Sequence, residues 1–218
     1  MCGRYALATN EKDLTNYYGD TPLIGYRGPS YNVAPSQYAP VVISDGLEQM
    51  KWGLIPQWAK SEKVGYSMIN AVGETVFDKN TFKKPILTSR CLIPASGFYE
   101  WLDTPDGKQP YYFTVKNRPI ISLAGLFVVR KDSEGQELKT FTILTTEANE
   151  LVSKVHDRMP VILTQDEERQ WLDPDMTEPE SIAELINPYP AEDMESHAVD
   201  RKVGNAKNDG PDLIKALD

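Results

Sequence analysis

The residue with the most distinctive chemistry stands at the second position of the chain. The sequence opens Met1-Cys2-Gly3-Arg4, and removal of the initiator methionine would leave the small residue Cys2 as the terminus. Its amine and thiol would then sit on adjacent carbons. Such a 1,2-aminothiol traps an aldehyde: the amine forms an imine, and the thiol closes on the imine carbon to give a thiazolidine. Reference pKa values near ~7.7–8.0 for the amine and ~8.5 for the thiol leave both nucleophiles available near neutrality.

A cysteine at this position can also be incidental, because chain termini are commonly frayed. The segment that follows, Arg4–Leu7, is strand-like and would anchor the terminus in a sheet. Gly3 would let the backbone approach a bulky substrate. These neighbours favour a reactive terminus over an incidental one.

Three further polar residues stand in apolar or tightly structured surroundings, where an unpaired polar group is expensive. They are Asn70, Glu100 and His156. Glu100 lies between Tyr99 and Trp101, so we expect a raised pKa that suits proton transfer near neutrality. His156 could act as an acid or base, although a structural hydrogen bond is the commoner role, and Asn70 could equally be a structural amide.

Two tryptophans could offer planes on which unpaired bases stack. Trp52 and Trp58 flank a short turn that contains Pro56. Packing in the core is an equal alternative for either indole. The second cysteine, Cys91, precedes an apolar run and is interpreted as a buried thiol.

The overall composition predicts one cytoplasmic domain over residues 1–218, with no membrane segment, no metal site and no disulfide framework. The net charge is -9, which disfavours a nucleic-acid ligand because phosphate binding depends on Lys and Arg. The charge is uneven, however. Residues 1–100 hold 10 basic and 9 acidic groups, whereas residues 101–218 hold 13 and 23. A neutral or basic face is therefore compatible with the first part of the chain, and the acidic surplus is interpreted as solvated surface.

Short β-branched and aromatic segments, punctuated by Gly, Pro, Asn and Asp, predict strands at 39–43, 111–115, 120–130 and 138–146. Turn residues at 44–46 and 133–135 predict hairpins. Helices are predicted from Asn10 to Tyr18, after a capping box of Thr164 and Glu167, and over 179–186. Strands outnumber helices without βαβ alternation, so we expect an α+β fold with a largely antiparallel, barrel-like core and few short helices.

Taken together, the motifs resemble the SRAP family, the SOS response-associated peptidases, which process abasic sites in DNA. The resemblance runs along nearly the whole chain. The matching blocks are Met1–Tyr5, Tyr31–Pro35, Trp52–Pro56, Ile69–Ala71 with Glu74-Thr75, Arg90–Ala95, Gly97–Trp101, His156–Pro160, and Val203–Asn205 with Asn208.

The resemblance implies a covalent crosslink between Cys2 and an abasic site in single-stranded DNA, which would shield the strand during the DNA-damage response. It implies catalytic roles for Asn70, Glu100 and His156, no cofactor, and peptidase or lyase-like side activities. We expect a monomer. The residues expected to contact DNA are Arg4, Asn32, Trp52, Trp58 and Arg158. The family's peptidase name implies removal of a leader, but here only Met1 precedes Cys2, so an ordinary aminopeptidase would suffice.

One position departs from the family pattern. After Asn-Ala the family usually has an Arg that contacts phosphate, whereas this chain has Val72-Gly73. Two other functions stay open. In one, Cys2 attacks a carbonyl as the nucleophile of a peptidase or amidase, with His156 as base. In the other, the protein is a non-catalytic module whose tryptophans grip single strands.

Overall fold

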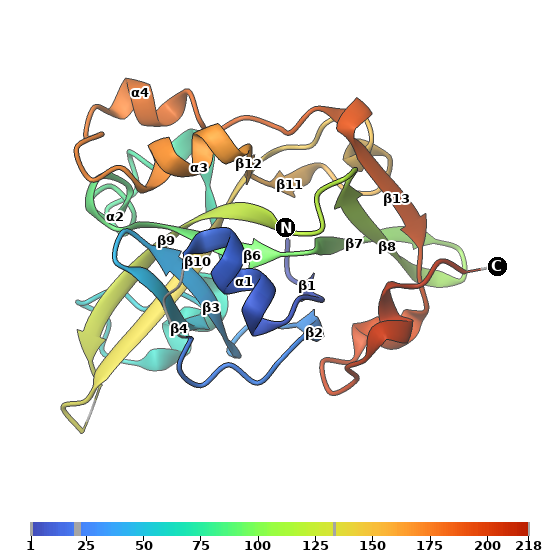
Figure 1. Cartoon of the computed structure of the whole chain (residues 1–218), viewed down its shortest axis with the longest axis horizontal. Coiled ribbons are helices and arrows are strands. Elements are labelled where there is room, and N and C mark those ends of the chain that lie inside the picture. The colour runs from blue at the N-terminus through green and yellow to red at the C-terminus, as the bar shows by residue number, and fades with distance from the viewer. Residues whose placement is uncertain (1, 20–22, 133, 218) are drawn as a thin grey trace.

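Five strands close into a barrel that forms the body of the protein. The computed structural model describes residues 2–19, 23–132 and 134–217. The barrel strands are β3 (Tyr38–Ile43), β4 (Gly46–Trp52), β6 (Arg90–Ala95), β9 (Ile121–Lys131) and β10 (Glu137–Glu147). β10 pairs with β4, β4 with β3, β3 with β6, β6 with β9, and β9 with β10, so the ring returns to its first strand. Figure 1 shows the barrel on the left of the molecule.

The predicted α+β class with a largely antiparallel, barrel-like core is confirmed. Only one pairing in the ring, β10 with β4, is parallel. These two strands are far apart in sequence, so no hairpin fixes their relative direction and no local signal revealed it. Gly125 lets β9 approach its neighbours, because a Cβ there would collide with the Ile93 side chain and lie 2.8 Å from the Thr142 carbonyl oxygen.

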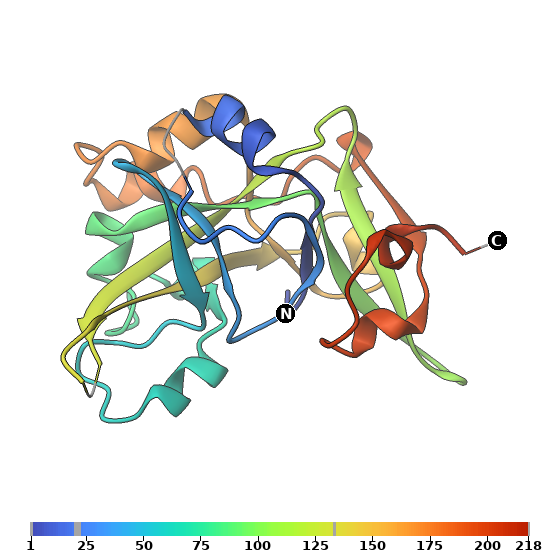
Figure 2. The same ribbon diagram turned by 60° about the horizontal axis from the view of Figure 1, so that its bottom comes forward.

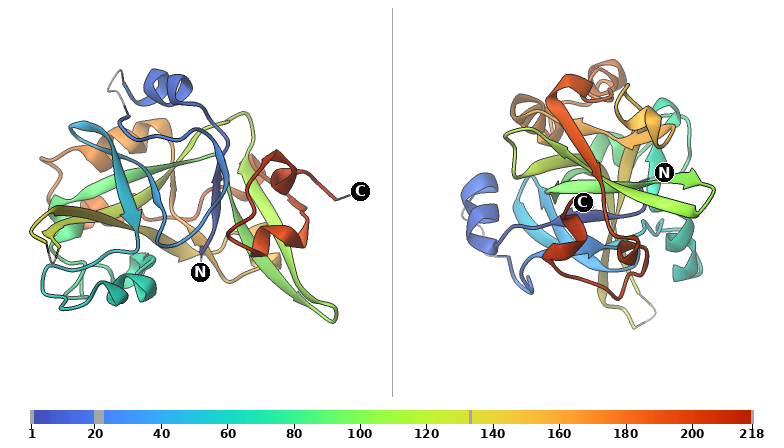
Figure 3. Two further views of the ribbon diagram at one scale, coloured as in Figure 1. Left: turned by 90° about the horizontal axis from the view of Figure 1, so that it is seen from below. Right: turned by 90° about the vertical axis from the view of Figure 1, so that its right-hand side faces the viewer.

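A second, antiparallel sheet lies beside the barrel, on the right in Figure 1. Its strands, in spatial order, are β13 (Met194–Ala198), β8 (Gly107–Val115), β7 (Gly97–Thr104), β1 (Tyr5–Leu7) and β2 (Ser30–Val33). In Figures 2 and 3, β1 runs between the barrel and the larger strands of this sheet. The C-terminal residues lie against the outer side of the same sheet.

The register of β1 against β7 determines what faces the N-terminus. Tyr5 pairs with Phe98 and Ala6 with Gly97, and the Tyr99 amide donates to the Arg4 carbonyl at 3.0 Å. Continuing this antiparallel register places Gly3 opposite Glu100. The strand predicted directly after Cys2 is therefore present, and it brings the first residues to the glutamate.

The second half of β10 leaves the barrel ring and carries two short strands. β5 (Asn70–Val72) pairs with it in parallel, with Asn70 beside Ile143, and β11 (Arg158–Pro160) pairs with it antiparallel. Both short strands meet β10 at Thr145. β12 (Ile162–Leu163) then returns to β9. β10 thus brings together two segments that are far apart in sequence, one that begins at Asn70 and one that begins at Arg158.

The helices are short, and two of them begin at their predicted capping residues. Asn10 caps α1 (Glu11–Tyr18), which ends at Gly19 with φ 112°. Thr164 and Glu167 form the predicted capping box of α3 (Gln165–Leu172). α2 spans Pro85–Thr88 and α4 spans Pro179–Ala183. The prediction of a helix to residue 186 was too long, because the last residues form a turn instead.

Both predicted hairpins are present. β3 and β4 meet at Ile43 and Gly46, and β9 and β10 meet at Lys131 and Glu137. Ser133, which was part of the second predicted turn, lies outside the described residues. Cys91 is buried on β6, as predicted. No helix in the described part of the chain is long and apolar enough to cross a membrane.

Candidate active site

Cys2 lies in the interior, with 0% of its surface exposed. Its Sγ is 4.0 Å from the carbonyl oxygen of Arg4. Burial raises the pKa of the thiol well above its ordinary value, and the charge of Glu100 raises it further. The expectation of a thiol with an ordinary pKa is therefore wrong for the chain that carries Met1. The buried thiol keeps its proton near neutrality and needs a nearby base to release it.

Glu100 is the carboxyl group whose charge acts on the Cys2 thiol, which makes it the candidate for this base. It is 2% exposed, on the β7 strand that pairs with β1. Burial raises the pKa of Glu100 to about 7, as its aromatic neighbours in the sequence predicted. A carboxyl group with this pKa is protonated in about half of the molecules at neutral pH, so it can donate a proton in one step and accept one in another.

His156 faces Glu100 across a gap. Its Nε2 lies 4.0 Å from Glu100 Oε2, and its Nδ1 accepts the backbone N–H of Arg158 at 3.0 Å. This acceptor role places the proton of the neutral ring on Nε2, toward Glu100. Burial lowers the pKa of His156, so the ring is neutral at physiological pH. Asp157 also lies 3.0 Å from Nδ1, but its side chain is 87% exposed and its charge is screened by water.

Asn70 presents an unused carboxamide to the interior. Its Oδ1 and Nδ2 atoms are buried and have no hydrogen-bond partner among the described residues. The hydroxyl of Thr145, on the paired strand β10, is in the same condition. Unsatisfied buried polar groups are rare in proteins and cost about 1–3 kcal/mol each. This pair of strands therefore holds polar atoms that are suited to bind a group supplied from outside.

A pocket of about 450 Å³ gives access to Glu100 and His156. Its other lining residues are Trp101, Lys108, Arg201 and Gly204. Lys108 and Arg201 were not predicted from the sequence, because neither belongs to a local motif. Trp101 and Gly204 did fall within the family blocks. The part of the chain that the structure describes holds no cluster of three or more His, Cys, Asp or Glu side chains suited to a metal ion.

Arg4 and Asn32 join the N-terminal strands to the C-terminal segment. Arg4 Nη1 donates to Asn32 Oδ1 at 2.7 Å and to the Val203 carbonyl at 2.8 Å. Asn32 is 2% exposed, and its Nδ2 donates to the carbonyls of Asn205 and Asn208 at 3.1 and 2.7 Å. Asn32, which we expected at DNA, is thus enclosed with its carboxamide occupied. Arg4 has at least one nitrogen committed to the same internal network.

Arg158 is engaged in a two-bonded ion pair. Its Nη1 and Nη2 donate to the Glu74 carboxylate at 2.8 and 2.7 Å, and Nη2 also donates to the Thr145 carbonyl at 2.8 Å. Hydrogen bonding by Arg158 lowers the pKa of Glu74. The guanidinium therefore fixes β11 against the segment after β5. Val72, at the position where the family usually has Arg, is 41% exposed and carries no charge.

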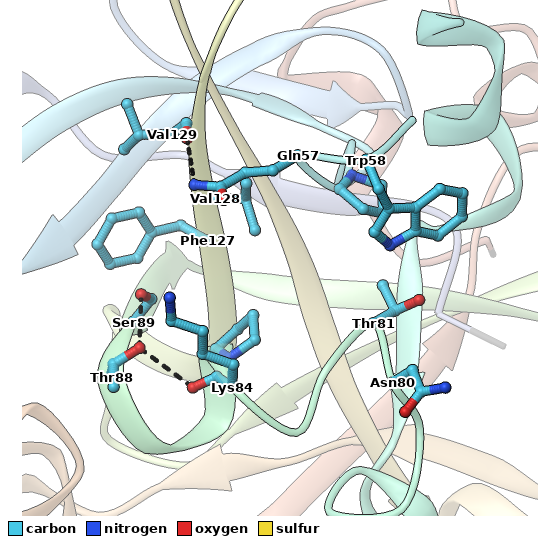
Figure 4. Close-up of a pocket in the computed structure, with 12 residues that line it drawn as sticks. Gln57, Trp58, Asn80, Thr81, Lys84, Thr88, Ser89, Phe127, Val128 and Val129 are labelled. Atoms are coloured by element: carbon cyan, nitrogen blue, oxygen red, sulfur yellow. Dashed lines mark hydrogen bonds between the residues drawn. The ribbon is translucent and has the colours of Figure 1, made fainter. Parts of the chain in front are cut away.

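The two tryptophans differ in their surroundings. Trp52 is 1% exposed, stacks on Phe141 at 6.2 Å, and donates its indole N–H to the Ile69 carbonyl at 2.9 Å. Trp52 therefore packs in the core, the alternative to base stacking, because a base cannot reach its buried ring. Trp58 is 65% exposed and stands at the rim of a separate pocket of about 300 Å³, with Lys84 and Phe127 among its other walls (Figure 4).

Comparison with known proteins gives a consistent result. The family profile described as SOS response associated peptidase (SRAP) matches residues 1–206. The chain is 45% identical over 224 residues to the abasic site processing protein YoqW of Bacillus subtilis, covering 99% of this chain and 100% of the relative. It is 33% identical to the abasic site processing protein HMCES of Gallus gallus, over 87% of this chain and 67% of the relative. A crystal structure of a protein from Bacteroides thetaiotaomicron superposes with a TM-score of 0.92 at 30% identity, covering 99% and 100% of the two chains.

Proposed function

Because the chain belongs to the SOS response associated peptidase family, we propose that it processes abasic sites in single-stranded DNA by forming a covalent adduct on Cys2. The relatives named above are abasic site processing proteins, which supports the substrate class. The observation that carries the proposal is the electrostatic interaction of the buried Cys2 thiol with Glu100, a glutamate of raised pKa that lines a pocket together with His156.

The chemistry balances without a cofactor. After removal of Met1, the Cys2 amine adds to the aldehyde of the opened deoxyribose and gives a carbinolamine. Loss of one water gives an imine. The thiol then adds across the C=N bond, with sulfur on carbon and the proton on nitrogen, to close a thiazolidine. The ring removes the imine that would act as an electron sink for β-elimination, so the strand stays intact.

The side chains at the site can supply each proton. Glu100 donates a proton to the departing carbinolamine hydroxyl and, as the carboxylate, accepts the proton of the Cys2 thiol, and its pKa of about 7 allows both roles. His156, with its Nε2 proton toward Glu100, assists ring opening of the sugar and reversal of the adduct. Asn70 orients the sugar or the terminal amine through its unused carboxamide. Closure is intramolecular once the imine exists, which favours it strongly.

Trp58 is the tryptophan we propose at the DNA. Its exposed indole, beside a pocket with Lys84 on its wall, offers a stacking face together with a positive charge for a neighbouring phosphate (Figure 4). Arg158 would act mainly by holding the His156 loop, because its guanidinium is bound to Glu74.

The test mixes purified protein with a single-stranded oligonucleotide that bears one abasic site and follows a mass-shifted band that survives denaturant. The matched control oligonucleotide carries a tetrahydrofuran residue, which has no aldehyde. We expect a stoichiometric adduct with the abasic strand only, and none with Cys2→Ala. Mass spectrometry of the amino terminus must show that Met1 is absent. Multiple-turnover cleavage of peptides without any DNA adduct would instead support the peptidase alternative.

A further inference from the structure

The pocket at the active site carries two positive charges that no motif explains. Lys108 extends from β8, and Arg201 from the 3-10 segment Arg201–Gly204. The other ionisable side chains that line the pocket are Glu100, which is about half protonated at neutral pH, and His156, whose pKa is lowered by burial. Lys108 and Arg201 are the basic side chains among the lining residues, on a chain whose net charge is -9.

The charge of Arg201 is not neutralised by a carboxylate among the described residues. Its Nη1 donates to the Asp106 backbone carbonyl at 2.8 Å and its Nε to the Gln109 side-chain oxygen at 3.4 Å. Both acceptors are uncharged. They fix the guanidinium against the β7–β8 hairpin while its full charge stays available to a ligand.

Lys108 is available in a similar way. Its Nζ lies 3.6 Å from Asp103, but the two side chains are 69% and 84% exposed, so this pair is weak. Burial is the main cause of the lowered pKa of His156, and the charge of Lys108 contributes to it, which indicates that the ammonium is near the ring.

Arg158 and Arg4, which were also expected at the DNA, are bound within the protein. Arg158 is bound to Glu74, and Arg4 Nη1 is bound to Asn32 and Val203. Val72 offers no charge where the family usually has an arginine. A strand that places its abasic sugar at Glu100 must still have its flanking phosphates neutralised.

We propose that Lys108 and Arg201 form a phosphate-binding rim that holds the backbone of the substrate strand at the mouth of the pocket. The inference rests on the proposed function, since it names the contacts through which the same substrate is held. Arg4 and Asn32 support the rim from behind, because they bind the carbonyls of Val203, Asn205 and Asn208 in the segment that carries Arg201.

The test measures equilibrium binding of a single strand with one tetrahydrofuran residue, which cannot crosslink, as a function of salt. Each phosphate contact on single-stranded DNA contributes about 0.7 to the slope of log K against log salt. We expect Lys108→Gln or Arg201→Gln to lower the slope by about 0.7, and the double variant by about 1.4. Affinity should fall about two- to five-fold per exposed charge. Lys108→Arg and Arg201→Lys should keep the slope.

The matched controls are Lys12→Gln on α1 and Arg27→Gln, which remove exposed charges of the same type away from the pocket. These variants should keep the parent slope. A double variant that melts like the parent and retains the parent slope overturns the rim. The Lys108 side chain is 69% exposed, so its single variant keeps the test valid if Arg201→Gln fails to fold.

Crosslinking to the aldehyde-bearing strand is measured separately on the parent. A parent that crosslinks while the double variant keeps its salt slope refutes the rim alone. A parent that binds through the rim but never crosslinks refutes the proposed function alone. A parent that does not bind single strands refutes both.

Discussion

Replacing Glu100 by glutamine should make the protein more stable in a pH-dependent way. Burial raises the pKa of Glu100 from 4.5 to about 7 in the folded state. Below about pH 4 the carboxyl is protonated in both the folded and unfolded states and contributes no pH-dependent term. As the pH rises from 4.5 to 7, the unfolded state ionises first, and folding loses stability until the folded carboxyl also ionises. At about 1.36 kcal/mol per pKa unit, the loss reaches about 3 kcal/mol above pH 7.

Glu100→Gln removes this penalty because the amide stays neutral. We expect equal stability of parent and variant near pH 4 and a gain of about 3 kcal/mol for the variant at pH 8. For a chain of this size the gain corresponds to a rise of about 6–12 °C in Tm. Denaturant titrations of both proteins from pH 4 to 8 measure the difference. A difference that does not change with pH, or a less stable variant at pH 8, would show that burial does not raise the pKa of Glu100 as described.

The same substitution should slow crosslinking, because the amide can neither donate nor accept the protons of dehydration and closure. A positioned general acid or base accelerates a reaction by about 10²- to 10⁴-fold, so we expect the rate of adduct formation to fall by a factor in this range. The crosslinking rate of the parent should have a bell-shaped pH dependence. It falls on the alkaline side because Glu100, with a pKa of about 7, loses its proton, and it falls on the acid side because the amine, with a pKa of about 7.7, is protonated. The variant should lose the alkaline decrease and keep the other, as measured by single-turnover adduct formation across pH.

Three further changes test other parts of the site. Asn70→Ala should leave Tm unchanged or slightly raised, because the carboxamide that it removes is buried without a hydrogen-bond partner among the described residues. Adduct formation should slow at least tenfold, and crosslinking at the parent rate would exclude Asn70 from the reaction. Arg158→Gln should lower the free energy of unfolding by about 1–2 kcal/mol at pH 7. Because Arg158 lowers the pKa of Glu74, the part of this loss that comes from the ion pair should disappear as the pH falls below 4.5. Denaturant titrations at pH 7 and pH 3 measure the difference. Trp58→Ala should weaken binding of a tetrahydrofuran strand about five- to 100-fold with Tm preserved, since the indole is 65% exposed; unchanged affinity would remove its stacking role.

Local chemistry in the sequence was sufficient to predict much of the fold. Asn10 and the Thr164–Glu167 box act through their own neighbours, so their helices could be located from a few residues. The β-branched runs predicted the barrel strands β3, β9 and β10, and the turn at 44–46 predicted the hairpin to β4, whereas β6 was not predicted as a strand. The raised pKa of Glu100 was also predictable, because Tyr99 and Trp101 flank it in the sequence.

Properties that depend on tertiary contacts could not be predicted in this way. Trp52 and Trp58 differ in burial because of tertiary contacts. Trp52 packs on Phe141 and donates its indole N–H to the Ile69 carbonyl, and neither contact can be read from the residues next to Trp52. One partner of Arg4, the Val203 carbonyl, is 199 positions away along the chain, so the charge of Arg4 looked free for a ligand. Lys108 has no sequence motif at all, and its place at the pocket is set by the β7–β8 hairpin.

The bond from Arg4 to the Val203 carbonyl also affects when the site can mature during synthesis. Arg4 is synthesised 199 residues before Val203, so it leaves the ribosome well before the segment to which it binds. Contacts between such distant segments form late, because closing a long loop is entropically unfavourable until most of the chain is present. The surroundings of Arg4, two residues after Cys2, are therefore complete only after the segment that carries Val203 has emerged and docked.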